Sequence, residues 1–183
     1  MKLVVGISGA TGGVLGVRLL ECLKEKEVET HVVITKTAEY ILRVEHGIGR
    51  EEVAKLSSRL YGIDDFTAPI ASGSFKWDGM VIIPCSMKTL AGVAHGYSDN
   101  LLLRAADVTL KEGRKLVLVV REAPLNIIHL RNMLTAAEAG AVILPPTLAF
   151  YHKPRTVQDL IDFAVGKVMD VLGLEHGLYR RWG

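Results

Sequence analysis

The sequence predicts an α/β fold built on a doubly wound, mostly parallel sheet. Two observations lead to this fold class. Short runs of branched apolar residues alternate with segments of helical period along the whole chain. The apolar runs are continuous, which is typical of strands that are buried on both faces of a parallel sheet. Since no linker, repeat or low-complexity segment interrupts the alternation, we expect one domain over residues 1–183.

About five strands are expected. The apolar runs that predict them are Leu3–Ile7, His31–Ile34, Met80–Ile83, Lys115–Val120 and Ala141–Leu144. Helices are expected where apolar residues recur every three to four positions. These segments are Gly13–Lys26, Ala38–Leu60 with a break near Gly47–Gly49, Asn100–Glu112, Ile127–Ala139 and Thr156–Leu172. Such an order is that of a three-layer sandwich, either flavodoxin-like or Rossmann-like. The stretch Tyr61–Asp78 has no regular pattern and is expected to be a surface loop or lid.

Composition excludes several functional classes. The 183 residues carry a formal net charge of only +2 with scattered charges, so nucleic acid is not an expected partner. No apolar stretch approaches the roughly 18 residues of a membrane span, and the N-terminal run is too short for a signal peptide. Cys22 and Cys85 form neither a disulfide framework nor a metal motif. We therefore expect a cytoplasmic protein, with part of its 49% apolar residues in subunit contacts.

Small polar residues follow the predicted strands. Ligands of such sheets bind beyond the carboxyl ends of the strands. The segments at these positions are Ser8-Gly9-Ala10-Thr11-Gly12, Thr35-Lys36-Thr37, Ser86-Met87-Lys88-Thr89 and Arg121-Glu122. The backbone N–H groups of a glycine loop that opens a helix form an anion site.

The glycine spacing favours a mononucleotide. Gly6-x-x-Gly9-x-x-Gly12 is neither the dinucleotide fingerprint nor a Walker loop, and Thr35-Lys36 occupies the place where a dinucleotide site needs an acidic residue. Three hydroxyl-bearing loops suit flavin mononucleotide (FMN) better. The alternative is that the glycines serve only close packing between strand and helix.

Several stretches together resemble the UbiX-type flavin prenyltransferases, also described as phenylacrylic acid decarboxylase-like proteins. They extend over nearly the whole chain: GISGATG, PCSMKTLAG (84–92), RAADVTLKE (104–112), VREAPL (120–125), GAVILPP (140–146), FYHKP (150–154) and the closing RRWG. The resemblance implies transfer of a dimethylallyl group from dimethylallyl monophosphate to reduced FMN, without a metal ion. The product, prenylated FMN, would serve a UbiD-type decarboxylase. A homododecamer with sites between subunits is implied as well.

The resemblance also assigns roles to residues. It implies FMN binding by Gly9, Ala10, Thr11, Thr35, Ser86, Met87, Lys88, Thr89 and Arg121. It implies donor binding by Arg104, Lys111, Tyr151 and Lys167, and catalytic roles for Glu122, Thr11, Glu45 and Lys111. Cations and phenols of this kind stabilise a leaving phosphate directly. Thr11 departs from the usual Ser, and Lys167 replaces a common Arg, so a point charge stands in place of a bidentate fork.

Two other functions compete with prenyl transfer. An FMN-dependent decarboxylase of the cysteine-decarboxylase group shares the fold, but its P-A-S-A-N-T-like segment differs from PCSMKT here, where Lys88 replaces the Asn. An FMN-binding carrier would not need a second group of cations. Among the remaining candidates, Cys85 is expected to serve packing, and no histidine has metal-ligand spacing. Trp77 and Phe66 could be core residues or form a wall beside the prenyl group, and Trp182 could belong to the same wall or to a subunit contact.

Overall fold

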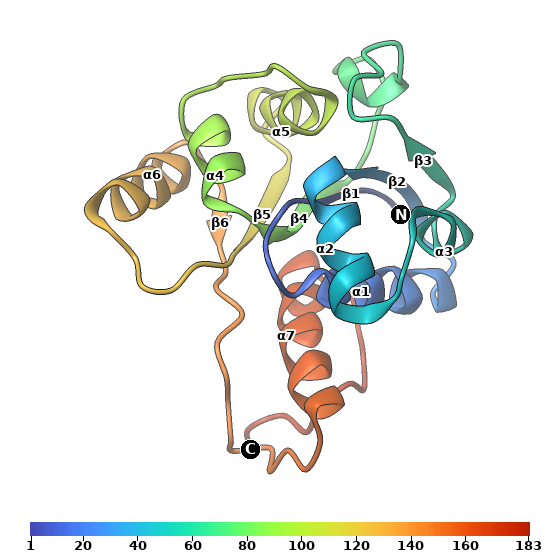
Figure 1. The fold of residues 1–183 in the computed structure, drawn as a ribbon, viewed down its shortest axis with the longest axis vertical. Helices are drawn as coiled ribbons and strands as arrows, with labels where there is room; N and C mark the ends of the chain where they lie inside the picture. Colours follow the sequence, from blue (N-terminus) through green and yellow to red (C-terminus); the bar gives the residue numbers. More distant parts are fainter.

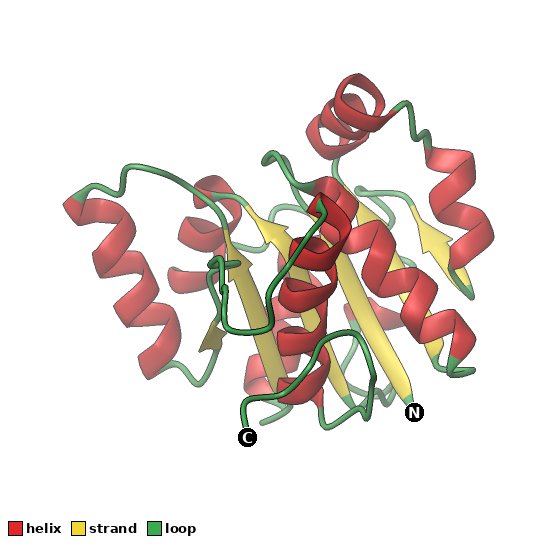
Figure 2. Ribbon diagram, turned by 90° about the horizontal axis from the view of Figure 1, so that it is seen from below, coloured by secondary structure: helices red, strands yellow, loops and turns green.

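The computed structural model describes residues 1–183 as one six-stranded parallel sheet with helices on both faces (Figures 1 and 2). In chain order the elements are β1 Lys2–Ile7, α1 Gly13–Glu25, β2 Glu29–Ile34, α2 Lys36–His46, α3 Arg50–Leu56, β3 Arg59–Tyr61, a 3₁₀ turn η1 Pro69–Ala71, β4 Gly79–Cys85, α4 Met87–Ala94, α5 Leu101–Lys111, β5 Lys115–Val120, α6 Ile127–Glu138, β6 Val142–Ile143 and α7 Val157–Leu172.

The strand order is β3-β2-β1-β4-β5-β6, and every neighbouring pair is parallel. The chain winds outward from β1 to β3, then crosses back to β4 and winds the other way. This order is the one of Rossmann folds, so the predicted doubly wound, three-layer class is confirmed. The reversal of direction lies between β1 and β4, where ligands of such sheets bind. None of the helices is both long and apolar enough to cross a membrane.

Each strand divides its side chains between two cores. On β1, Leu3, Val5 and Ile7 pack into the layer of α1 and α7, whereas Val4 faces the layer of α4 and α5. All four are fully buried. Continuous apolar strands are therefore required here, because both faces of the sheet are covered.

Two elements were not expected from the sequence. β3 is a sixth strand at the edge of the sheet; its residues Arg59 and Leu60 lie at the end of the predicted helix, and Tyr61 begins the predicted loop. The helical segment does break near Gly47, as expected, but α3 already ends at Leu56. α4 was missed because it is only eight residues long and follows the strand directly, through the cap residue Ser86.

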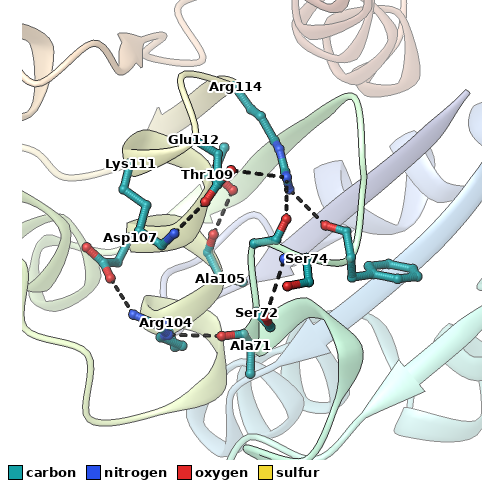
Figure 3. A network of polar contacts seen from close by, with 12 residues as sticks. Ala71, Ser72, Ser74, Arg104, Ala105, Asp107, Thr109, Lys111, Glu112 and Arg114 are labelled. Carbon is teal, nitrogen blue, oxygen red and sulfur yellow. Dashed lines mark hydrogen bonds and ion pairs between the residues drawn. The ribbon is translucent and has the colours of Figure 1, made fainter.

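The segment 61–78 is irregular, as expected, but it is held down and is not a lid. The Arg114 guanidinium donates hydrogen bonds to the carbonyls of Gly73 and Phe75, at 2.9 and 3.2 Å (Figure 3). It also lies 4.1 Å from the ring centre of Trp77. Trp77 is buried and donates its indole N–H to Thr109 at 3.2 Å. Of the two roles expected for it, Trp77 therefore has the one in the core.

Residues beyond β6 leave the body of the molecule. The segment 144–156 runs along α7 away from the sheet, and the last residues return to its far end (Figure 1). We call residues 144–156 and 174–183 the C-terminal arm. It exposes large apolar side chains, among them Leu148, Phe150 and Trp182.

Helix α1 approaches the sheet closely at Gly16. A Cβ atom on this residue would lie 2.6 Å from the carbonyl oxygen of Ile83, a backbone atom that cannot move aside. We expect Gly16→Ala to lower the free energy of unfolding by about 1–3 kcal/mol, although alanine is the better helix former. Denaturant titration measures this loss. The matched control is Gly62→Ala, since a Cβ there meets only Asp65 at 3.8 Å; equal stability of both variants would contradict the prediction.

Candidate active site at the carboxyl edge of the sheet

The hydroxyl of Ser8 ties the loops after β1 and β4 together. Ser8 is fully buried; its Oγ donates to the carbonyl of Pro84 at 2.9 Å and accepts the N–H of Ser86 at 2.8 Å. The two loops follow β1 and β4, the strands between which the winding of the chain changes direction. The glycine loop and the segment 86–89 are thus held side by side at the expected ligand position.

Three helix N-termini open onto one pocket beside these loops. Thr35, Ser86 and Asn100 are the N-cap residues of α2, α4 and α5, and each side chain accepts a backbone N–H of its own first turn. The other N–H groups of a first turn have no partner within the helix, and the helix dipole adds positive potential. The pocket therefore favours an anion such as a phosphate.

The pocket has a volume of about 290 Å³ and is partly open. It is lined by Gly9, Thr35, Thr37, Ser86, Met87, Lys88, Thr89, Asn100, Leu102, Leu103 and Glu122. Hydroxyls and helix ends suit a phosphate, and the apolar side chains of Met87, Leu102 and Leu103 suit a planar ring. Because the volume is at the low end for a small-molecule site, part of a flavin would extend beyond this subunit. The residues fit FMN.

Thr37, Asn100, Leu102 and Leu103 line the pocket but were not among the predicted site residues. Asn100 carried a usable signal, since an Asn directly before an apolar helical segment is a typical N-cap. Thr37 was noticed only as part of a strand-end segment. Its side chain touches Gly9 closely enough that a Cβ at Gly9 would lie 2.6 Å from its Cγ2 atom.

Thr11, Glu45 and Arg121 form a second group at the glycine loop. Gly12 has φ 90°, a conformation that favours glycine, and donates its N–H to Glu45 Oε2 at 3.1 Å. A hydrogen bond from the Thr11 side chain, the Gly12 N–H and the charges of His46 and Arg121 lower the pKa of Glu45. The structure thus brings Thr11, Glu45 and Arg121 together, and the loop already holds an anionic oxygen at its N–H group.

Glu122 follows β5 and lies at the mouth of the pocket. It is exposed, and its Oε1 accepts the N–H of Ala123 at 3.0 Å. No ion pair joins it to Arg121 within this subunit. The carboxylate is free to contact a ligand.

Arg104 and Lys111 lie on α5, outside this pocket. Arg104 donates to the carbonyl of Ala71 at 3.0 Å and to Asp107 at 2.8 Å, and Lys111 forms an ion pair with Glu112 (Figure 3). Lys111 is ten residues beyond Leu101, about 15 Å along the helix and toward the opposite edge of the sheet. Within one subunit these cations do not reach the flavin pocket.

Tyr151 lies in the C-terminal arm, and Lys167 lies on α7. The Tyr151 ring packs edge-on against Phe163 and Trp182, with centroid distances of 5.8 and 5.4 Å. Lys167 on α7 is half exposed and lies 3.7 Å from Asp170. Neither residue lines the pocket at the glycine loop. None of the four predicted donor-binding residues thus lines the flavin pocket of the same chain.

Another hollow of about 290 Å³ lies at the amino edge of the sheet, between Lys24, Glu29 and Lys55. It has no converging helix N-termini, and so its size alone does not make it a candidate. No three His, Cys, Asp or Glu side chains are gathered in a way that could hold a metal ion. Cys85 is fully buried, which raises the pKa of its thiol and makes it inert, as expected for a packing residue.

Comparison with known proteins identifies the family of this chain. Residues 1–169 match the family model described as Flavoprotein. Flavin prenyltransferase UbiX from Methanocaldococcus jannaschii is 48% identical over 183 residues, which cover 100% of this chain and 99% of the relative. The chain belongs to the UbiX flavin prenyltransferase family.

Solved structures agree with the assignment to this family. The structure of AnUbiX (PadA1) in complex with FMN and dimethylallyl pyrophosphate has a TM-score of 0.98 and 48% identity, covering 100% of this chain and 97% of that one. A dodecameric FMN-dependent UbiX-like decarboxylase from Escherichia coli O157:H7 also has a TM-score of 0.98, with 52% identity over all of both chains. The cysteine decarboxylase TvaF shares only the fold, with a TM-score of 0.64 and 19% identity over 78% of this chain and 88% of that one.

The glycine loop provides a direct test of flavin binding. We expect Thr11→Glu to abolish FMN binding, because a second carboxylate would be added beside Glu45 at a loop that must accept an anionic cofactor. The measurement is the flavin absorbance of the purified protein. Thr11→Ser is the matched control, since it keeps the hydroxyl and should stay yellow. A fully flavinated Thr11→Glu protein would refute the site.

Proposed function

We propose that this protein is a flavin prenyltransferase that makes prenylated FMN. It transfers the dimethylallyl group of dimethylallyl monophosphate to N5 of reduced FMN and closes a ring onto C6. The C–O bond of the donor breaks, a C–N bond forms as N5 loses its proton, and phosphate leaves. Ring closure then forms a C–C bond between C6 and the prenyl group, with one proton added to the prenyl double bond and one lost from C6. The main support is the pocket at the carboxyl edge of the sheet, onto which three helix N-termini open. The chain also matches a flavin prenyltransferase over its whole length.

FMN is bound in this proposal by the groups that meet at the Ser8 contact. Gly9, Ala10 and Thr11 contribute the glycine loop, and Thr35 and Arg121 come from the ends of β2 and β5. Ser86, Met87, Lys88 and Thr89 contribute the first turn of α4. Reduced FMN supplies the nucleophilic nitrogen, and the chain holds it and excludes water on the apolar side formed by Met87, Leu102 and Leu103.

The donor phosphate is bound in this proposal by residues of other copies of the chain. Arg104 and Lys111 lie on α5, Lys167 on α7 and Tyr151 in the C-terminal arm, and none of them lines the pocket of its own subunit. A homododecamer, the assembly named for the Escherichia coli O157:H7 neighbour, would bring such surfaces to the pocket of a neighbouring subunit.

Two exposed apolar surfaces support this assembly. One lies on and before α6, where Leu125, Ile127, Ile128, Leu130 and Leu134 are 42–62% exposed. The other is the C-terminal arm with Leu148, Phe150 and Trp182. Side chains of this size at such exposure mark contacts with another chain.

The difficult step is the departure of a phosphate, and Glu122 is positioned for it in this proposal. Arg104, Lys111 and Lys167 offset the charge that develops on the leaving group. Glu122 lies at the mouth of the flavin pocket without a salt-bridge partner, where it delivers a proton to a phosphate oxygen. Glu45 and Thr11 act at the glycine loop and orient the flavin.

The two rival functions are less well supported. The cysteine decarboxylases share the fold at under 25% identity, and Lys88 replaces the Asn of their segment. A carrier of FMN would not need a second anion site such as the one proposed for Arg104, Lys111, Tyr151 and Lys167.

The assay that separates these functions uses FMN, dithionite and dimethylallyl monophosphate, followed by the mass of the released flavin. We expect a flavin heavier by one prenyl unit, formed at the same rate with and without EDTA, because side-chain cations stabilise the leaving phosphate. An unchanged flavin mass would refute prenyl transfer. A rate that EDTA abolishes and Mg²⁺ restores would refute the role of these cations.

A second test concerns Glu122. We expect Glu122→Gln to keep FMN bound while single-turnover prenyl transfer slows at least tenfold, about 1.4 kcal/mol of transition-state stabilisation. Glu122 accepts only a neighbouring N–H, so the amide should not disturb the fold. Glu138→Gln, on the surface of α6, is the control for loss of one negative charge. If the Glu122→Gln rate equals that of the wild type, the proton comes from another group.

We also propose that residues 1–183 form a single FMN-binding domain and that the protein acts in the cytoplasm. Cys22 and Cys85 are both free and buried, and they lie in the two separate cores on opposite faces of the sheet. A chain that keeps its thiols reduced fits a reducing compartment. Fractionation of the source cells tests this location.

A further inference from the structure

Asp170 on α7 is the most heavily hydrogen-bonded carboxylate near the C-terminal arm. Its Oδ1 accepts from Arg181 at 2.6 Å and from His176 Nε2 at 3.1 Å, and its Oδ2 accepts from the Tyr179 hydroxyl at 2.6 Å. Burial alone would raise the pKa of Asp170, but the hydrogen bonds from Arg181 and Tyr179 and the adjacent positive charge hold it at about 2. Asp170 is therefore ionised at neutral pH and binds three residues of the last eight.

Gly166 makes room for this contact. A Cβ atom at Gly166 would lie 2.6 Å from Tyr179 Cε1 and 2.7 Å from His176 Cε1. Gly166 lies one turn before Asp170 on α7 and directly precedes Lys167. The end of the chain can therefore lie against the helix only because this position has no side chain.

Aromatic contacts link the Asp170 cluster to Tyr151. The Tyr179 ring packs on Phe163 at a centroid distance of 4.8 Å, and Phe163 packs on Tyr151 at 5.8 Å. Trp182 directly follows Arg181, the residue that Asp170 binds, and packs edge-on against the other side of Tyr151 at 5.4 Å. The position of the Tyr151 ring thus depends on where the last residues of the chain are held.

Lys167 is the fourth and most distant polar partner of Asp170. Its Nζ lies 3.7 Å from Oδ2, and its side chain is 47% exposed. If the Lys167 ammonium binds a phosphate instead, Asp170 keeps its hydrogen bonds from Arg181, His176 and Tyr179. Its carboxylate is then not left unpaired. The ion pair is therefore one that a dianion can displace at little cost.

We propose that Asp170 is a positioning residue for donor binding. It fixes the chain end so that Trp182 packs on Tyr151, and it holds Lys167 in a weak ion pair that the donor phosphate can displace. This inference rests on the proposed function, in which Tyr151 and Lys167 contact the donor. It gives the closing residues 176–182 a role that the flavin pocket itself does not require.

The kinetic test compares Asp170→Asn with Asp162→Asn. Asp162 lies on the same helix and binds Arg18 of α1 at 2.7 Å, away from the chain end, so its loss is a control for weakened packing of α7. We expect Asp170→Asn to raise the KM for dimethylallyl monophosphate at least fivefold, with kcat within twofold and FMN content unchanged. Asp162→Asn should leave this KM unchanged. An unchanged KM in Asp170→Asn would overturn the positioning role.

A second variant keeps the carboxylate and moves the chain end instead. Gly166→Ala leaves Asp170 intact but collides with Tyr179 and His176. We expect the same rise in the KM for dimethylallyl monophosphate. In both Asp170→Asn and Gly166→Ala, trypsin should cleave after Arg181 faster and remove the last two residues. Mass spectrometry of the intact protein measures this cleavage. Asp162→Asn should be trimmed at the wild-type rate.

The kinetic and the trypsin measurements separate the inference from the function on which it rests. A wild-type protein that makes no prenylated flavin would overturn the proposed function and, with it, the role in donor binding. Wild-type trimming rates in Asp170→Asn and Gly166→Ala would overturn the attachment of the chain end itself, whatever the activity.

Discussion

The hydroxyl of Ser8 is the contact on which the flavin pocket depends. It joins the glycine loop after β1 to the first residues after β4, across the point where the sheet changes its winding direction. Because the hydroxyl is fully buried and both its donor and acceptor capacity are used, the two loops are held in one relative position. The N-termini of α2, α4 and α5 then point into one space, and an anion-binding pocket follows from strand order and helix capping.

The same geometry explains why one subunit is not enough for the proposed reaction. The flavin pocket lies at the carboxyl edge, Lys111 lies at the other end of α5, and Tyr151 lies beside the chain end. Exposed apolar side chains cover α6 and the C-terminal arm. In the proposed assembly these apolar surfaces contact neighbouring subunits. The association that buries them would therefore also complete the donor site. Arg104 and Lys111 already have carboxylate partners, which orient them before a donor binds.

Most of the fold could be predicted because buried parallel strands are continuous apolar runs, as in β1, β4 and β5. β3 could not, since an edge strand of three residues, Arg59–Tyr61, has no such pattern. At the site, the glycine loop and Ser86–Thr89 follow from strand ends, whereas the roles of Arg104 and Lys111 followed from family resemblance. Helical spacing puts two cations on one face, but it does not say which copy of the chain they serve. The buried contacts of Ser8 and the partly exposed contacts of Asp170 join residues distant in sequence or in irregular structure, which periodicity does not reveal.

The central claim is that the flavin pocket of one copy works with the cations of another. Co-expression of Thr11→Glu, which lacks FMN, with Lys111→Ala tests it most directly. Each variant alone should be nearly inactive. If Lys111 acts on a neighbouring subunit, random mixed oligomers pair intact pockets with intact lysines and should regain about a quarter of the wild-type prenyl-transfer activity. If Lys111 acts within its own subunit, every copy carries one lesion, and mixed oligomers as inactive as the single variants would contradict the account.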